Sequence, residues 1–215
     1  MKSSQNMGAA AFSIRQITVI GVLTAITVVL GQFGLGFLVI PGLPLKITIM
    51  HIPVIIGAII EGPVVGAIVG LLFGIFSIIQ NMMVPTPLSF ALLNPLVSVL
   101  PRILIGITSY YAYKAIIIKS DVVTVSVANR VFKVIAEAVK TSIAAAVGTA
   151  TNTIGVLGMI YILYAAPFAE LRNVDVSKVG SVIAGIAVTN GIPEVIAAMI
   201  ISTAVITALK KIVKR

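Results

Sequence analysis

Between Gly62 and Gln80 the chain reads GPVVGAIVGLLFGIFSIIQ, a run without a charged residue. A helix needs about 20 mostly apolar residues to cross the roughly 30 Å hydrocarbon layer of a bilayer, and this run approaches that length. Its glycines recur at every fourth residue and therefore share one helix face, where a neighbouring helix can approach closely. They are Gly62, Gly66, Gly70 and Gly74. The run predicts a transmembrane helix packed tightly against another helix.

The rest of the 215-residue chain has the same apolar character. Hydrophobic residues make up 59% of the sequence and charged residues only 10%, and the mean hydropathy is +1.18. This balance leaves too little polar surface for a water-soluble domain. We therefore expect a single all-α membrane domain over residues 1–215, a bundle of six transmembrane helices. The expected spans, of which the second is short, are Gln16–Leu35, Lys46–Ile60, Pro63–Gln80, Leu88–Tyr113, Ile135–Tyr164 and Val179–Leu209.

The net charge of +9 is best explained by membrane topology. The basic residues lie at the ends of apolar runs and not on a solvated face, which argues against nucleic-acid binding. Six crossings place both termini on one side, and Lys and Arg in short loops favour the cytoplasmic side. With cytoplasmic termini, eleven of the fifteen basic residues lie inside: Lys2, Arg15, Lys114, Lys119, Arg130, Lys133, Lys140, Lys210, Lys211, Lys214 and Arg215. The sequence therefore predicts a multi-pass cell-membrane protein with both termini in the cytoplasm.

Three connections then face outward, Gly36–Leu45, Asn81–Pro87 and Ala165–Lys178, and each contains proline. Proline breaks helices and stiffens loops. Such segments suit a lid over an outward-facing pocket, or they serve as plain connectors. Arg172 and Lys178 in the last connection make the outer mouth electropositive, which attracts an anion.

Two charged residues lie near the middle of expected spans, Arg102 in the fourth and Glu194 in the sixth. A charge at this depth costs about 2.5 to 3.5 kcal/mol on insertion scales, so it usually faces a cavity or another charge. The two side chains can neutralise one another, or they can serve a bound solute. In the second case Arg102 would hold a carboxylate through paired, charge-assisted hydrogen bonds.

Asparagines accompany these charges: Asn94 in the fourth span, Asn152 in the fifth and Asn190 in the sixth. Asn190 and Glu194 are one turn apart and share a helix face. Three of the polar positions have a neighbouring proline, which frees a backbone carbonyl one turn earlier for a ligand or a side chain. These prolines are Pro95, Pro101 and Pro193. The pattern predicts either a binding pocket or a polar clasp between helices.

Three polar residues near the outer ends complete the candidate substrate-binding set. Lys46 and His51 open the second span, where a cation can reach water or an anionic solute. Asn81 begins the second outer connection. A lone histidine is also often a structural hydrogen-bond donor, and this alternative stays open for His51.

The sequence carries no catalytic or metal-binding signature. It has no cysteine and a single histidine, which excludes thiolate chemistry and multi-histidine metal sites. It lacks the Gly-x-x-x-x-Gly-Lys-Ser/Thr phosphate loop and the His-Glu-x-x-His and Gly-x-Ser-x-Gly hydrolase motifs. We therefore expect no enzymatic activity, no cofactor and no metal, and any energy from ATP must come from partner subunits.

Three segments stand out together: HIPVIIGAIIEGPVVGAIVGLLFG at residues 51–74, LNPLVSVLPR at 93–102 and NGIPE at 190–194. They resemble the S components of energy-coupling factor (ECF) transporters, in the branch that contains the pantothenate, folate and cobalamin proteins. The likeness covers nearly the whole chain. It implies a six-helix subunit that captures a vitamin-like solute in its outer half and topples in the membrane to release it. A midplane arginine and a basic mouth favour a carboxylate, and the resemblance then implies pantothenate first, folate second and cobalamin third.

The resemblance also implies partners. The family docks its first helix onto a shared transmembrane T subunit through an Ala-x-x-x-Ala motif, and Gly21 and Ala25 occupy the matching place here. Two ATPase subunits bound to the T subunit would supply the energy. A stand-alone secondary transporter is the alternative, although we find no convincing internal repeat. An intramembrane enzyme is less favoured, because Arg102, Glu194 and His51 form no recognisable catalytic set.

Overall fold

The computed structural model describes residues 12–39, 46–116 and 127–213, and these form one helical bundle with a short hairpin. Five helical segments of the described residues are long and apolar enough to cross a membrane, and α2 is a sixth, shorter apolar helix. The predicted all-α membrane fold is therefore confirmed. The elements are α1 (Ile14–Gln32), β1 (Phe37–Val39), β2 (Lys46–Thr48), α2 (Ile52–Glu61), α3 (Pro63–Met83), α4 (Ser89–Leu92), α5 (Pro95–Ser98), α6 (Leu100–Ala115), α7 (Val127–Arg172), the 3-10 turn η1 (Val176–Lys178) and α8 (Val179–Val213).

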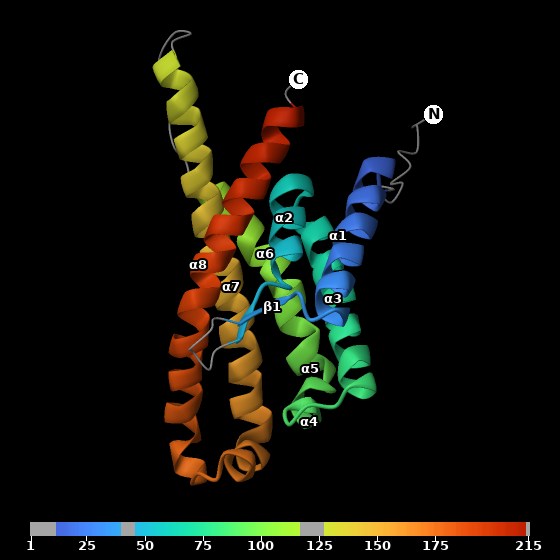
Figure 1. Ribbon diagram of the computed structural model, residues 1–215, viewed down its shortest axis with the longest axis vertical. Coiled ribbons are helices and arrows are strands. Elements are labelled where there is room, and N and C mark those ends of the chain that lie inside the picture. The colour runs from blue at the N-terminus through green and yellow to red at the C-terminus, as the bar shows by residue number, and fades with distance from the viewer. Residues whose placement is uncertain (1–11, 40–45, 117–126, 214–215) are drawn as a thin grey trace, which may run out of the picture.

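The main helices alternate in direction along the long axis of the bundle (Figure 1). We call the end at the top of Figure 1, where α1 begins and α8 ends, the upper end, and the opposite end the lower end. Helices α1 and α2 occupy only the upper half, and the hairpin that joins them lies at mid-height. The lower half is formed by α3, the short helices α4 and α5, and the long helices α7 and α8.

The second expected span, Lys46–Ile60, is wrong at its beginning. Lys46–Thr48 is a strand that pairs antiparallel with β1, with Phe37 opposite Thr48. The helix starts only at Ile52, because Pro53 has no N–H to donate and fits best in the first turn of a helix. The crossing at this point is therefore a half-length helix of 10 residues above a hairpin.

The fourth expected span, Leu88–Tyr113, is a helix interrupted twice. Pro95 and Pro101 each occupy the first turn of a new helix, so α4, α5 and α6 follow one another with short breaks. The side chain of Asn94 caps α5 by accepting a hydrogen bond of 2.9 Å from the N–H of Leu96. Free backbone carbonyls at these breaks are available to side chains.

The third outer connection, Ala165–Lys178, is mostly helical and not a loop. Helix α7 continues to Arg172, although its backbone leaves helical geometry at Tyr164, where φ is −138° and ψ is 28°. Pro167 lies just beyond and cannot donate to the carbonyl one turn earlier. The expected fifth span therefore ends where the helix kinks, and a short helical segment follows the kink.

The glycine stripe of α3 packs directly against the backbone of α6, as the sequence predicted. A Cβ atom at Gly70 would lie 2.1 Å from the carbonyl oxygen of Arg102, and one at Gly74 would lie 2.7 Å from the Cα of Val99. Gly106 of α6 faces Gly66 in the same way, because a Cβ atom at Gly106 would overlap the carbonyl carbon of Gly66. This contact fixes the height of Arg102 in the bundle.

Two hydrophobic clusters form the core, one above the other. The first joins α2, α3, α6, α7 and α8 and includes Phe73, Ile105, Ala145 and Ala198. The second joins α4, α5, α7 and α8 and includes Ala91, Val97, Ile160 and Ile183. The chain positions between the two clusters carry the buried charged residues Arg102 and Glu194.

We predict that Gly70→Ala lowers stability, because the added methyl group must displace the backbone of α6. Overpacking of this kind costs about 1 to 3 kcal/mol, which a thermal melt of the purified protein will detect. Gly158→Ala on α7 is the matched control, because a Cβ there meets no described atom within 4 Å. Equal melting temperatures for the two variants would contradict this packing.

Candidate functional site

A layer of polar side chains separates the two hydrophobic clusters. The chain passes from one cluster to the other through polar positions in three places: from α5 to α6 between Val97 and Ile105, in α7 between Ala145 and Ile160, and in α8 between Ile183 and Ala198. We call these residues the central polar cluster: His51, Arg102, Thr149, Asn152, Thr153 and Glu194. Polar side chains inside a membrane bundle are costly unless they are paired, so this layer is the candidate binding site.

Arg102 owes its position to Pro101. Because Pro101 has no N–H, the carbonyl of Val97 is not taken by the helix, and Arg102 Nη1 donates to it at 2.6 Å. The guanidinium also lies over the Phe73 ring, 5.5 Å from its centroid. Arg102 Nε is buried and has no hydrogen-bond partner among the described residues. The predicted use of a proline-freed carbonyl is thus confirmed here, and the arginine keeps one buried donor unused.

His51 is completely buried at the start of α2. Its Nε2 lies 2.9 Å from the hydroxyl oxygen of Thr149, which itself donates to the carbonyl of Ala145 at 2.8 Å. Because the Thr149 proton is already used, the neutral ring donates from Nε2 and keeps Nδ1 as an acceptor. Nδ1 is buried and has no partner among the described residues.

Glu194 is hydrogen-bonded to the hairpin and not to Arg102. Its Oε1 accepts a hydrogen bond of 2.9 Å from the backbone N–H of Thr48 on β2, and Thr153 of α7 lies beside it. Within the described residues, Arg102 and Glu194 form no ion pair with each other. The interpretation that the two charges neutralise one another is therefore wrong, because each has a backbone partner on its own side of the cluster.

Several unused hydrogen-bonding atoms lie in this layer. Nine buried side-chain atoms of the described residues have no partner, and four of them belong to the central polar cluster. They are Arg102 Nε, His51 Nδ1, Asn152 Oδ1 and Thr153 Oγ1. Buried polar groups are almost always hydrogen-bonded in native proteins, so this set of one donor, two acceptors and a hydroxyl suits a small polar solute.

The other predicted site residues are outside the cluster as defined, and Asn94 and Asn81 serve the short helices instead. Asn94 caps α5 and donates to the hydroxyl of Tyr164 at 3.0 Å, beside the kink of α7. Asn81 accepts from the Ser89 hydroxyl at 2.7 Å and so ties α3 to α4. Asn190 is half-buried on α8, one turn before Glu194. Lys46 lies on β2, and its side chain falls outside the described structure.

Two threonines and a backbone group of the site were not predicted. Thr149 and Thr153 flank Asn152 on one face of α7, at the i, i+3 and i+4 spacing that could have identified them. Threonine is common in apolar helices, where its hydroxyl usually bonds to the carbonyl one turn earlier, so a lone threonine carries little signal. The sequence predicts Thr48 inside a helix, and its N–H is therefore not expected to be a partner of Glu194.

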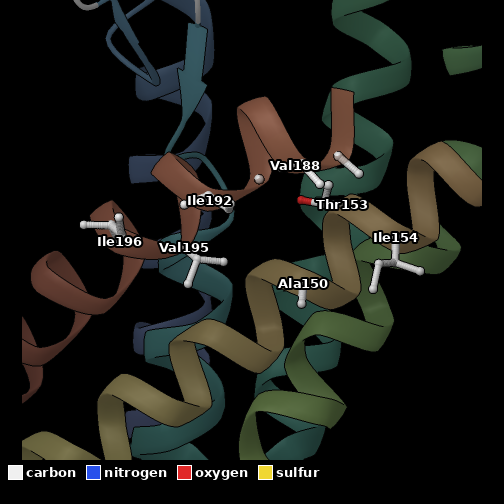
Figure 2. A pocket seen from close by; sticks show the side chains of 9 residues that line it. Ala150, Thr153, Ile154, Val188, Ile192, Val195 and Ile196 are labelled. Carbon is white, nitrogen blue, oxygen red and sulfur yellow. The ribbon is translucent and has the colours of Figure 1, made fainter. Parts of the chain in front are cut away.

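Two surface grooves are present, and neither encloses the cluster. One, of about 360 Å³, runs between α7 and α8, and Figure 2 shows its apolar lining of Ile154, Val188, Ile192 and Ile196 around Thr153. These aliphatic side chains are exposed, as expected of a surface that faces lipid. The other, of about 340 Å³, lies at the lower end between Thr86–Leu88 and Leu171–Arg172. Two of the connections predicted to face outward therefore meet there.

The two predicted docking residues lie on the outer face of α1. Gly21 and Ala25 are exposed, and a Cβ atom at Gly21 would meet no described atom within 4 Å. The buried residues of α1 are Thr27 and Gly31, which lie lower on the helix. Unlike the glycines of α3, this small-residue pair is not used for packing within the described bundle.

Three known proteins or families are similar to this chain. The family model described as "ECF transporter, substrate-specific component" matches residues 15–206. The pantothenic acid transporter PanT of Lactococcus lactis subsp. cremoris (strain MG1363) is 31% identical over 210 residues, covering 91% of this chain and 93% of that protein. A solved structure, described as the S component of a bacterial ECF transporter, matches with a TM-score of 0.48 and 20% identity, covering 94% of this chain and 98% of that one. On the family match and the sequence identity, this chain belongs to the substrate-specific components of ECF transporters.

Proposed function

We propose that the central polar cluster binds pantothenate, or a solute of the same chemistry, for import by an ECF transporter. The observation that carries this proposal is the pairing of an unused arginine donor with unused acceptors in one buried layer. Pantothenate has a carboxylate, an amide and hydroxyl groups. Arg102 would hold the carboxylate, while His51 Nδ1 and Asn152 Oδ1 would accept hydrogen bonds from hydroxyl or amide groups. The similarity to PanT supports the same solute.

The role of this subunit is binding, and the energy comes from elsewhere. The chain lacks a phosphate-binding loop, so ATP hydrolysis belongs to the two ATPase subunits that work with the T subunit in this family. Its charged interior residues are engaged with backbone groups and are not arranged as a nucleophile with a base. We therefore assign it no catalytic activity.

We predict that Arg102→Gln weakens pantothenate binding by roughly ten- to a hundredfold, the usual effect of losing a charge-assisted hydrogen bond. Glutamine can still donate to the carbonyl of Val97, so the protein should fold. The dissociation constant from calorimetry and the melting temperature without solute should be measured together. Lys114→Gln, which removes a charge from the last turn of the same helix, is the control and should bind normally. Unchanged affinity in folded Arg102→Gln would exclude Arg102 from the site.

We also propose that the upper end is cytoplasmic. Arg15, Lys114, Lys210 and Lys211 belong to helix ends that meet there, and short basic segments resist translocation. A reporter fused after Arg215 that is active only in the cytoplasm should therefore be active, and one active only outside should be silent. The opposite pattern would refute this orientation.

Helix α1 is the proposed docking surface for the T subunit. Small residues allow close helix contact in a membrane, and Gly21 and Ala25 are free of internal contacts that would account for them. Replacing both by leucine should abolish co-purification with the T subunit and pantothenate uptake. Solute binding by the isolated subunit should be unaffected, and its loss would indicate that the pair serves internal packing instead.

A further inference from the structure

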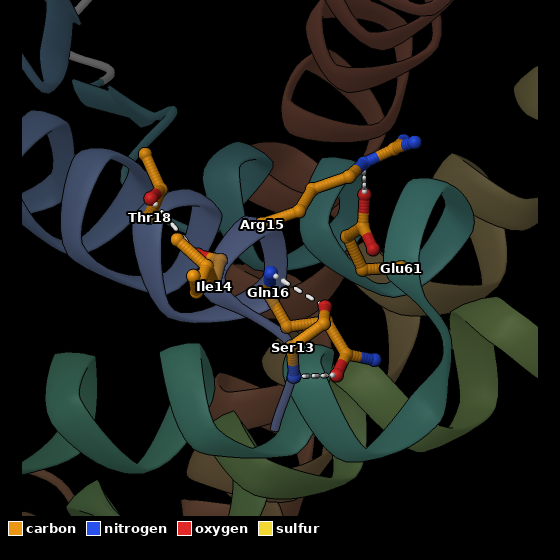
Figure 3. A network of polar contacts seen from close by, with 6 residues as sticks. All are labelled: Ser13, Ile14, Arg15, Gln16, Thr18 and Glu61. Atoms are coloured by element: carbon orange, nitrogen blue, oxygen red, sulfur yellow. Dashed lines mark hydrogen bonds and ion pairs between the residues drawn. The ribbon is translucent and has the colours of Figure 1, made fainter. Parts of the chain in front are cut away.

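An ion pair joins the upper end of α1 to the junction between α2 and α3. Arg15 Nε lies 2.7 Å from Glu61 Oε1, and Figure 3 shows the Arg15 side chain reaching across from the first turn of α1. Glu61 is the last residue of α2, directly before the Gly62 turn into α3. The Arg15 side chain is 61% exposed and that of Glu61 only 9%, so the carboxylate depends on this partner more than the arginine does.

The start of α1 is built so that Arg15 is held in place. Ser13 caps the helix: its hydroxyl accepts from the N–H of Gln16 at 3.2 Å, and its own N–H donates to Gln16 Oε1 at 3.1 Å. This reciprocal capping box stabilises the first turn against fraying. The Arg15 backbone is therefore ordered, and its side chain starts from a defined position (Figure 3).

The rest of α1 is attached mainly at its lower end. Its buried residues are Thr27 and Gly31, and Gln80 of α3 donates to the carbonyl of Gly31 at 2.8 Å. Higher up, Val19 and Leu23 are only partly buried against the first hydrophobic cluster. Lipid tails are as apolar as these side chains, so such contacts hold a helix in place only weakly. An ion pair at the upper end therefore matters more than it would in a soluble protein.

The ion pair lies on the face of α1 that packs inward. Arg15 is four and eight residues before Val19 and Leu23, which places all three along one side of the helix. Gly21 and Ala25 lie on a different side and are exposed. Fixing Arg15 against Glu61 therefore fixes the rotation of α1 about its axis, and with it the direction in which the small-residue pair points.

We propose that the Arg15–Glu61 ion pair is a latch that holds α1 in the rotation and tilt required for docking. The proposal rests on the proposed role of α1 as the surface for the T subunit. Arg15 and Glu61 are thus positioning residues: they touch neither the solute nor the T subunit, and they act through the placement of Gly21 and Ala25. Breaking the latch loosens the upper half of α1 while the central polar cluster keeps its geometry.

The test measures the placement of α1 directly. The chain has no cysteine, so a single pair of spin labels can be introduced at Ile17 of α1 and Val64 of α3, both exposed. In the labelled protein, Arg15→Gln and Glu61→Gln should each broaden the distance distribution between the labels. The charge swap Arg15→Glu with Glu61→Arg, and the conservative Arg15→Lys, should restore it. Lys210→Gln is the matched control, because it breaks an ion pair with Glu137 at the same end of the bundle without touching α1.

The same variants, without labels, test the link to docking. Arg15→Gln and Glu61→Gln should weaken association with the T subunit by about three- to tenfold, the range expected between an exposed and a buried ion pair. The charge swap should restore association, and the pantothenate dissociation constant should stay at the wild-type value throughout.

Unchanged label distances in both single variants would overturn the latch. Changed distances with normal association would overturn its role in docking. The Gly21→Leu/Ala25→Leu protein separates the two proposals: if it fails to associate while Arg15→Gln associates normally, the docking face stands and the latch fails. If it associates normally, the docking face itself fails.

Discussion

The close backbone contact between α3 and α6 is the constraint on which the rest of the structure depends. Gly70 lies against the carbonyl of Arg102 and Gly66 against Gly106, at distances that no side chain could occupy. Because the two backbones are so close, α6 has little freedom to slide along α3. A slide would bring larger side chains into the contact in place of the glycines. The height of Pro101 and Arg102 in the bundle follows from this register.

The central polar cluster follows from the same register. Pro101 leaves the Val97 carbonyl unbonded, Arg102 takes it, and one guanidinium nitrogen remains without a described partner. On the opposite side, Thr149 uses its proton on the helix backbone and so fixes the His51 ring with an acceptor facing the interior. Within the cluster, Pro101 leaves the Val97 carbonyl to Arg102, and the Thr149 hydroxyl joins the Ala145 carbonyl to the His51 ring.

The sequence predicted those features that depend on local pattern. Long apolar runs gave five of the spans, and the spacing of the α3 glycines predicted a tight helix contact that the structure contains. The depth of Arg102 and Glu194 pointed to an interior polar site, because charges are costly there. The Pro101 position correctly indicated a carbonyl free to bond a side chain.

What the sequence could not predict depends on contacts between distant segments. Lys46–Thr48 lies just before the apolar run of α2 and so reads as the beginning of that span, and only pairing with β1 makes it a strand. Glu194 is separated by 146 positions from Thr48, its partner, so the sequence left open whether Glu194 pairs with Arg102 or serves a solute. Asn81 and Asn94 resemble ligand-binding residues in sequence, yet their amides are used to cap and tie the short helices of the lower half.

The central claim is that a buried arginine in this subunit recognises the carboxylate of its solute. The most direct measurement compares the affinity of the purified protein for pantothenate with its affinity for pantothenol, in which a neutral hydroxymethyl group replaces the carboxylate. The account predicts that pantothenol binds at least about tenfold more weakly, because the charge-assisted contact is lost while the remaining groups are unchanged. Equal affinity for the two compounds, or no binding of pantothenate, would contradict it.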